Sequence, residues 1–229
     1  MNDDKHLIIG NGQIGKSLYN VLIKTTDVEI IDKEWFSTEG LLDFLHITFG
    51  YDENFEKEVF KYQETYQPKH TIIHSTVPVG TSKRLKAVHS PVIGIHPYLE
   101  ESIETFTKFV GGEGVDEVAD MFRKCGIKIQ KSQKSETTEF AKLQSTLFYG
   151  VCIEFVKEME TLCDKHNIPF SEAYTLWTQT YNEGYKKLGH PEYNRPILQP
   201  LQKKMGGHCV KPNLKLSESK FAKFIDERN

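Results

Sequence analysis

The feature that most constrains the fold is a glycine-rich run near the N-terminus, Gly10-Asn11-Gly12-Gln13-Ile14-Gly15. It follows a short apolar segment, Lys5–Ile9, and precedes residues 14–23, whose apolar side chains have helical spacing. Glycines in such a run let the backbone turn tightly and approach a pyrophosphate at the N-terminus of a helix. A strand, this turn and a helix together predict the first unit of a Rossmann-type sheet that binds a dinucleotide through these six residues.

Short apolar runs alternate with helical patterns as far as about residue 132. Further strands are expected at 28–31, 45–49, 71–74, 92–95 and 127–129. This alternation indicates an α/β protein with a doubly wound, mainly parallel sheet. Beyond it, apolar residues recur every three or four positions over 137–166, which predicts one long amphipathic helix. We therefore expect a Rossmann-type domain, residues 1–132, followed by a smaller all-helical domain, residues 133–229.

Asp32, at the end of the second expected strand, bears on the choice of cofactor. A carboxylate at this place accepts hydrogen bonds from a ribose diol and repels a 2′-phosphate, so NAD is favoured over NADP. The neighbouring Lys33 weakens that preference, and both residues are candidates for contact with the cofactor.

The same stretch also fits a second pattern, GxxxxGK[ST], through Gly10, Gly15, Lys16 and Ser17. In a P-loop NTPase, Lys16 would hold phosphates and Ser17 a magnesium ion. A purely structural turn would bind no nucleotide at all. The early glycine pair and Asp32 suit a dinucleotide better, so NAD is the expected cofactor, and the other two interpretations stay open.

The charge balance and the cysteines narrow the classes of partner. With 29 basic and 32 acidic residues, the net charge of −3 argues against a broad nucleic-acid or anionic-membrane surface. No apolar window approaches the ~20 residues that cross a bilayer, and the start of the chain lacks the features of a signal peptide. The four cysteines are far apart and the histidines lack ligand spacing, so we expect no metal and a reduced, cytoplasmic compartment.

Three further motifs follow the glycine run in the order and approximate spacing of one enzyme family. They are Ser75-Thr76-Val77-Pro78-Val79-Gly80-Thr81, Glu139-Phe140-Ala141-Lys142 and Gly206-Gly207-His208-Cys209. Over residues 5–216 the chain thereby resembles the UDP-glucose/GDP-mannose dehydrogenases, within the 6-phosphogluconate dehydrogenase-like superfamily. The last motif is most similar to the GGHC loop of the N-acetylmannosamine-type enzymes.

The resemblance implies an NAD-dependent oxidation of an alcohol on a small sugar-like or hydroxy-acid substrate, in one or two hydride steps. Cys209 is then the nucleophile, which forms a thiohemiacetal and a thioester. Lys142 stabilises the developing oxyanion, and Thr76 lies beside the nicotinamide, with Ser75 in the same cofactor-binding segment. The long helix over 137–166 is implied to bury its apolar stripe against a second copy in a homodimer.

The chain departs from the family pattern at several places. Thr146 stands where the family has Asn, and Asn213 stands where it has Asp; both are kept as candidate catalytic residues. The chain also ends soon after Cys209, as in a short form without the C-terminal domain that binds much of the nucleotide in the family. A regulatory NAD-binding protein that has lost catalysis is therefore the alternative function.

Overall fold

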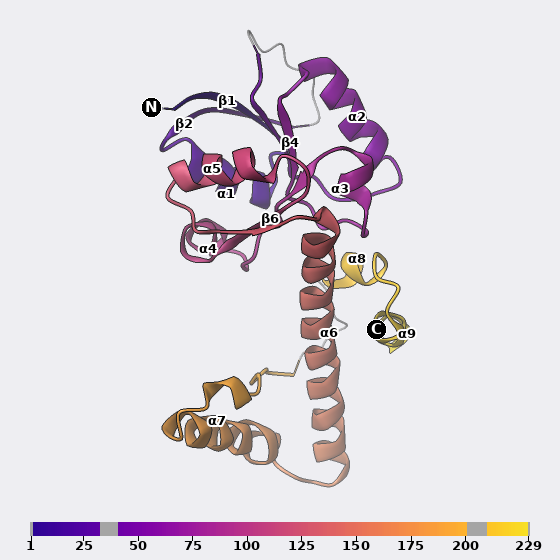
Figure 1. The fold of residues 1–229 in the computed structure, drawn as a ribbon. Helices are drawn as coiled ribbons and strands as arrows, with labels where there is room; N and C mark the ends of the chain where they lie inside the picture. Colours follow the sequence, from indigo (N-terminus) through magenta and orange to yellow (C-terminus); the bar gives the residue numbers. More distant parts are fainter. Residues whose placement is uncertain (1, 33–40, 201–209, 229) are drawn as a thin grey trace. The chain divides into compact units, whose positions relative to one another are not determined.

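The computed structural model describes residues 2–32, 41–200 and 210–228. It divides into two compact units, residues 1–142 and residues 143–229, and each unit is described by itself (Figure 1). The division falls within the long helix, beyond the boundary at residue 132 expected from the sequence. Lys33 and Cys209, two of the candidate site residues, lie outside the described residues.

The first unit is built on a seven-stranded sheet with the order β2-β1-β3-β4-β5-β6-β7. The strands are β1 (Asn2–Ile9), β2 (Thr26–Ile31), β3 (Phe44–Ile47), β4 (His70–Ile73), β5 (Val88–His89), β6 (Lys108–Gly111) and β7 (Ile129–Ser132). Neighbouring strands are parallel, except for the antiparallel pair β5 and β6. The chain passes from β1 to β2 on one side and then to β3 on the other. The carboxyl ends of β1 and β3 therefore meet at a topological switch point, where ligands bind in such sheets.

Helices cover both faces of this sheet (Figure 1). One face carries α1 (Gln13–Leu22), α4 (Leu99–Thr105) and α5 (Val115–Lys124), and the other carries α2 (Phe55–Tyr66) and α3 (Thr81–Arg84). Alternate residues of β1 supply the two cores: Ile8 packs in the α1 core, whereas Leu7 and Ile9 pack in the α2 core. The predicted doubly wound, mainly parallel sheet is confirmed.

Two strand predictions differ from the structure, and one strand was not predicted. The strand expected at residues 92–95 is wrong, because Gly94 has a φ of 143° there and Ile95 is 71% exposed. A two-residue strand at Val88–His89 takes that place in the sheet. The last strand begins at Ile129 rather than Ile127, which is buried before the strand starts. Strand β6 was not predicted, because it begins with Lys108, a charged residue that is buried in the fold.

The second unit is helical in the part of the chain that the structure describes. The long helix α6 (Ser135–Lys165) leads from the first unit into it, which confirms the long amphipathic helix. It is followed by a π-helical turn η1 (Ser171–Leu176), α7 (Trp177–Lys187), a 3-10 turn η2 (Pro191–Tyr193), α8 (Val210–Leu214) and α9 (Lys220–Arg228). Ile153 of α6, Leu214 and Ile225 share one apolar cluster. Within the described ranges, no helix is long and apolar enough to span a bilayer.

Candidate active site

The glycine run forms the turn between β1 and α1. Gly10 has a φ of 112°, and its N–H donates to the Ile31 carbonyl oxygen at 2.8 Å, which fastens the turn to the end of β2. Helix α1 begins at Gln13, with Gly12 at its N-cap. Because Gly12 has no side chain, it leaves the first N–H groups of the helix uncovered. Those groups are the ones that hold a phosphate at a helix N-terminus.

Close packing explains why two of these positions are glycine. A Cβ on Gly15 would lie 1.9 Å from the Gly10 carbonyl oxygen, and a Cβ on Gly10 would lie 2.7 Å from Thr48 Oγ1. A Cβ on Gly12 would meet nothing within 4 Å among the described residues. The fold itself therefore needs Gly10 and Gly15, whereas the space beside Gly12 is open to a ligand, as close approach of a pyrophosphate requires.

Thr48, which directly follows β3, supports the turn from the neighbouring strand. Its hydroxyl lies 2.9 Å from the carbonyl oxygens of both Ile9 and Gly10. The sequence did not single out Thr48, because a lone threonine after an apolar run belongs to no motif. Only the strand order, which puts β3 beside β1, reveals its role. Asp32 follows β2 at the same edge of the sheet and is exposed, as contact with a ribose requires.

The start of α1 argues against the P-loop interpretation. Lys16 and Ser17 lie inside the helix, and the Lys16 N–H donates to the Gly12 carbonyl at 3.0 Å. Only Gly10–Gly12 separate β1 from α1. A loop of that length is too short to wrap around phosphates in the way that the P-loop motif does.

The Ser75–Thr81 motif leaves the carboxyl end of β4, beside the glycine turn. Ser75 is buried, and its hydroxyl donates to the carbonyl of Phe49, whose N–H group in turn borders Gly10. Thr76 is half-buried next to it. At the far end of the motif, the Thr81 hydroxyl donates to the Pro78 carbonyl at 2.7 Å. The motif is thus anchored at the edge where the dinucleotide is expected.

A buried carboxylate fastens this motif to helix α6. The side chain of Glu139 is fully buried, and its oxygens accept the N–H groups of Gly80 at 2.6 Å and Ser82 at 2.7 Å. These N–H groups belong to the start of α3, where a negative charge is favoured. Two motifs far apart in the sequence therefore meet through charge-assisted hydrogen bonds. The sequence showed Glu139 only as a letter of its motif, not as the residue that joins them.

His89 makes a second link between the same two segments. Its Nε2 lies 3.2 Å from the Ser75 carbonyl oxygen, and its Nδ1 lies 2.8 Å from Thr138 Oγ1 on α6. Burial lowers the pKa of His89 to about 3, so the ring is neutral at physiological pH. Thr138 Oγ1 in turn donates to the Ser135 carbonyl at 2.9 Å, at the start of α6.

Lys142 follows Thr138 and Glu139 at the spacing of one helical turn, so all three share a face of α6. Its side chain is half-buried, and Nζ donates to the Val92 carbonyl at 2.8 Å. The structure therefore places the candidate lysine on the helix face that holds the Ser75–Thr81 motif. Glu139 and His89 are the residues that bring those elements together.

The remaining candidates are Thr146, Asn213 and Cys209. Thr146 on α6 and Asn213 in α8 are half-buried residues of the second unit, and their catalytic roles stay predictions. Cys209 lies outside the described residues, so its role as nucleophile also stays a prediction. Among the described residues, no group of three or more His, Cys, Asp or Glu side chains could hold a metal ion.

Comparison with known proteins gives no match to a family model and no match among the curated proteins. Solved structures do match. A UDP-D-ManNAc dehydrogenase from Pyrococcus horikoshii has a TM-score of 0.77 at 16% identity, with 98% of this chain and 68% of that chain covered. A UDP-glucose dehydrogenase from Pyrobaculum islandicum has a TM-score of 0.72 at 12% identity, with 99% and 68% covered.

A 3-hydroxyisobutyrate dehydrogenase from Mycobacterium tuberculosis matches with a TM-score of 0.68 at 13% identity, with 99% of this chain and 92% of that chain covered. Its coverage shows that the two-unit layout also occurs in a chain of similar length. The similar structures thus include nucleotide-sugar dehydrogenases, the family that the sequence motifs resemble. This chain has the Rossmann-type fold with a long-helix unit that those dehydrogenases share.

Proposed function

We propose that this chain is an NAD-dependent dehydrogenase that oxidises an alcohol of a small sugar-like or hydroxy-acid substrate. The observation that carries the proposal is the linkage at the carboxyl edge of the sheet. Glu139 joins the Ser75–Thr81 motif to the helix face of Lys142, beside the glycine turn. Solved structures of the same fold that are named as dehydrogenases support the same reaction class.

The residues present suit a dinucleotide. The Gly10–Gly15 turn leaves room for close backbone approach at Gly12, and exposed Asp32 is available to accept hydrogen bonds from a ribose diol. The same carboxylate would repel a 2′-phosphate, which favours NAD over NADP. Bound NAD+ would supply the hydride acceptor.

The chain's own residues would position the alcohol and stabilise its charge. The Lys142 ammonium would donate to the substrate oxygen as negative charge develops there, while its contact with the Val92 carbonyl sets its direction. Thr76, three residues beyond the end of β4, would orient the substrate or a water beside the cofactor. Cys209 is the nucleophile if the oxidation continues from aldehyde to acid, because a thiolate can hold the aldehyde as a thiohemiacetal.

The second candidate function is a regulatory NAD-binding protein without turnover. Thr146 and Asn213 favour it, because they replace the Asn and Asp of the motifs that the chain resembles. In this alternative the glycine turn and Asp32 keep their roles, and Lys142 serves only the fold.

We also propose that the chain forms a homodimer through α6. In the second unit, α6, η1 and α7 line an apolar hollow of about 690 Å³. Phe148, Phe155 and Trp177 on its lining are 61%, 53% and 71% exposed. A continuous exposed apolar surface of this kind is typical of a protein interface.

The proposal is tested by following NADH formation on a panel of nucleotide sugars and hydroxy acids. We expect turnover on at least one member and a loss of about 10²-fold or more in Lys142→Met, the range found when a group that stabilises an oxyanion is removed. Lys128→Met is the control, because Lys128 is exposed on the surface of the same unit. NAD+ binding without turnover would favour the regulatory alternative, and undiminished turnover in Lys142→Met would contradict the assigned role.

A further inference from the structure

The carbonyl that Lys142 contacts belongs to the short segment Ser90–Val92, which follows β5. This segment is tightly held where it begins. The Ser90 N–H donates to the Ile73 carbonyl at 2.9 Å, and the Ser90 hydroxyl donates to the Phe109 carbonyl at 3.0 Å. Ser90 is thus bound to strands on both sides, and the acceptor of Lys142 lies only two residues further along the chain.

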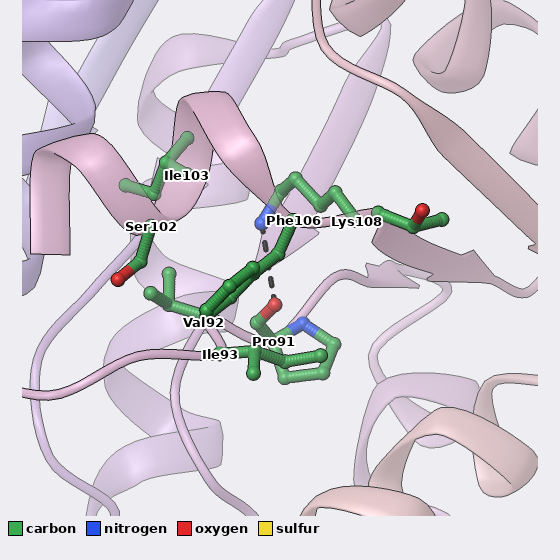
Figure 2. A pocket seen from close by; sticks show the side chains of 8 residues that line it. Pro91, Val92, Ile93, Ser102, Ile103, Phe106 and Lys108 are labelled. Atoms are coloured by element: carbon green, nitrogen blue, oxygen red, sulfur yellow. Dashed lines mark hydrogen bonds between the residues drawn. The ribbon is translucent and has the colours of Figure 1, made fainter. Parts of the chain in front are cut away.

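A second lysine donates to the same segment. Lys108 of β6 points its ammonium at the Pro91 carbonyl, at 3.3 Å (Figure 2). The same ammonium donates to the Ser90 carbonyl at 3.0 Å. Together with the contact from Lys142, three successive carbonyls, those of Ser90, Pro91 and Val92, accept hydrogen bonds from two lysines.

Burying a lysine at position 108 costs desolvation free energy. Its side chain is buried, and the ammonium lies 5.2 Å from the centroid of the Phe122 ring. Burial, helped by the positive charge of Lys142, lowers the pKa of Lys108 to about 7. An apolar side chain of the same length would fill the space without desolvating a charge, so packing alone does not account for a lysine.

We propose that Lys108 is a positioning residue for Lys142. By holding the Ser90 and Pro91 carbonyls, it fixes the next carbonyl, that of Val92, and so directs the Lys142 ammonium toward the substrate. The inference rests on the proposed function, in which Lys142 contacts the substrate oxygen.

A column of three buried histidines also contacts the Ser90 carbonyl oxygen. It approaches from the β4 side, whereas Lys108 approaches from β6. His74 Nδ1 lies 2.7 Å from the Ser90 carbonyl oxygen, His46 Nδ1 lies 3.0 Å from His74 Nε2, and His6 Nδ1 lies 3.0 Å from His46 Nε2. Because a carbonyl only accepts, His74 carries its proton on Nδ1, and each earlier ring must then donate from Nδ1 as well. The column is therefore directed across β1, β3 and β4 toward Ser90.

The titratable and charged groups around Lys108 come from four elements. They are His46 on β3, His74 directly after β4, His89 on β5 and Lys142 on α6. Burial lowers the pKa of all three histidines, which keeps them neutral at physiological pH. The three histidines therefore keep their charge near neutrality, where Lys108 titrates, and a contact that depends on the charge of Lys108 would change over that pH range.

Nuclear magnetic resonance of protein labelled with ¹³C at the lysine Cε tests the coupling without any substrate. We expect the Lys108 signal to titrate with a midpoint of about 7 and the Lys142 signal to shift with the same midpoint. In Lys108→Met, the shift of the Lys142 signal near pH 7 should disappear. The control is Lys57→Met, which replaces an exposed lysine of α2; there the shift of the Lys142 signal should persist. A Lys142 signal that ignores the titration of Lys108, or that keeps its shift in Lys108→Met, would overturn the inference.

Activity separates this inference from the proposed function. On any substrate that is turned over, Lys108→Met should lower kcat by about tenfold, the scale of a small misplacement, and leave the KM for NAD+ unchanged. If that variant does not fold, the wild-type titration decides alone. Coupled lysines in a protein without turnover would contradict the proposed function, whereas turnover without coupling would contradict the positioning role.

Discussion

Glu139 and the glycines of the β1–α1 turn show how single residues set the geometry of the candidate site. The Glu139 carboxylate has both of its oxygens engaged by backbone N–H groups in a fully buried place. Gly10 and Gly15 have no room for a Cβ, whereas Gly12 does. Glycine is therefore required for folding at positions 10 and 15, whereas at position 12 it is required only for a ligand to approach.

Glu139→Gln should lower the free energy of unfolding by about 2 kcal/mol, because an amide group would then face a buried N–H donor that has lost its acceptor. Unfolding in urea measures the loss. Glu136→Gln is the matched control on the same helix. Its ion pair with Lys83 is largely exposed on the lysine side, so that change should cost less than about 1 kcal/mol. Equal losses in the two variants would contradict the linking role of Glu139.

Gly12→Ala should leave stability nearly unchanged and weaken NAD+ binding, because the new methyl group occupies only the space that a pyrophosphate would approach. Gly15→Ala should instead destabilise the protein by about 2 kcal/mol or more, since its Cβ would overlap the Gly10 carbonyl. Thermal unfolding and NAD+ titration of both variants check this separation. Gly184→Ala in α7 is the control, and it should stabilise the helix by about 0.5–1 kcal/mol without affecting binding. Full NAD+ affinity in Gly12→Ala would argue against the dinucleotide interpretation.

Strands β1, β3 and β4 act together through the column His6–His46–His74, an element-scale feature that no single strand shows. Burial lowers the pKa of His6 to about 4 and that of His46 and His74 well below the ordinary value. His89 on β5 is lowered to about 3 by the same cause. These four rings stay neutral in the folded protein under conditions where they would be protonated in the unfolded chain.

The folded protein should therefore lose stability as the pH falls through the unfolded pKa of 6.5 toward the lowered folded values. Between about pH 7.5 and pH 5.5, the loss is about 1.4 kcal/mol per ring, or roughly 5.5 kcal/mol for the four. Urea unfolding at several pH values measures it. His6→Gln should reduce this dependence, and the exposed control His96→Gln should leave it unchanged. A free energy of unfolding that stays constant over this pH range would contradict the conclusion that these rings are neutral in the folded protein.

The elements also show what the sequence could and could not predict. The glycine run and the apolar strands β1–β4 were predictable, because their patterns are local and end in turn residues. Strand β6 was not, because the buried Lys108 reads as a surface residue in a sequence. Thr48, Glu139 and His89 were missed as supports of the site, because their partners become neighbours only through the strand order and the docking of α6. The role of Cys209 rests on its motif alone.

At the scale of the whole molecule, the chain comprises a Rossmann-type unit and a helical unit, and the helical unit has an exposed apolar surface. Phe148, Phe155 and Trp177 lie on that surface, and the proposed homodimer would cover it. The similar solved structures establish the fold of the molecule; reaction, cofactor and assembly are proposals for this chain.

Phe155→Arg should convert a dimer into a monomer, because it places a charge in the centre of the proposed interface. Sedimentation velocity at several concentrations measures the change. Phe221→Arg is the control, since Phe221 is 64% exposed on α9, away from the lining of the hollow. A wild-type protein that stays monomeric at high concentration, or a dimer unaffected by Phe155→Arg, would contradict this interface.

The central claim is that the edge formed by the glycine turn and Asp32 holds NAD, and isothermal titration calorimetry of the purified chain tests it most directly. We predict saturable one-to-one binding of NAD+, weaker binding of NADP+, and a smaller difference between the two in Asp32→Ala, which removes the carboxylate that repels the 2′-phosphate. A folded protein that releases no heat with NAD+, and instead binds ATP with magnesium in a manner abolished by Lys16→Ala, would contradict the account.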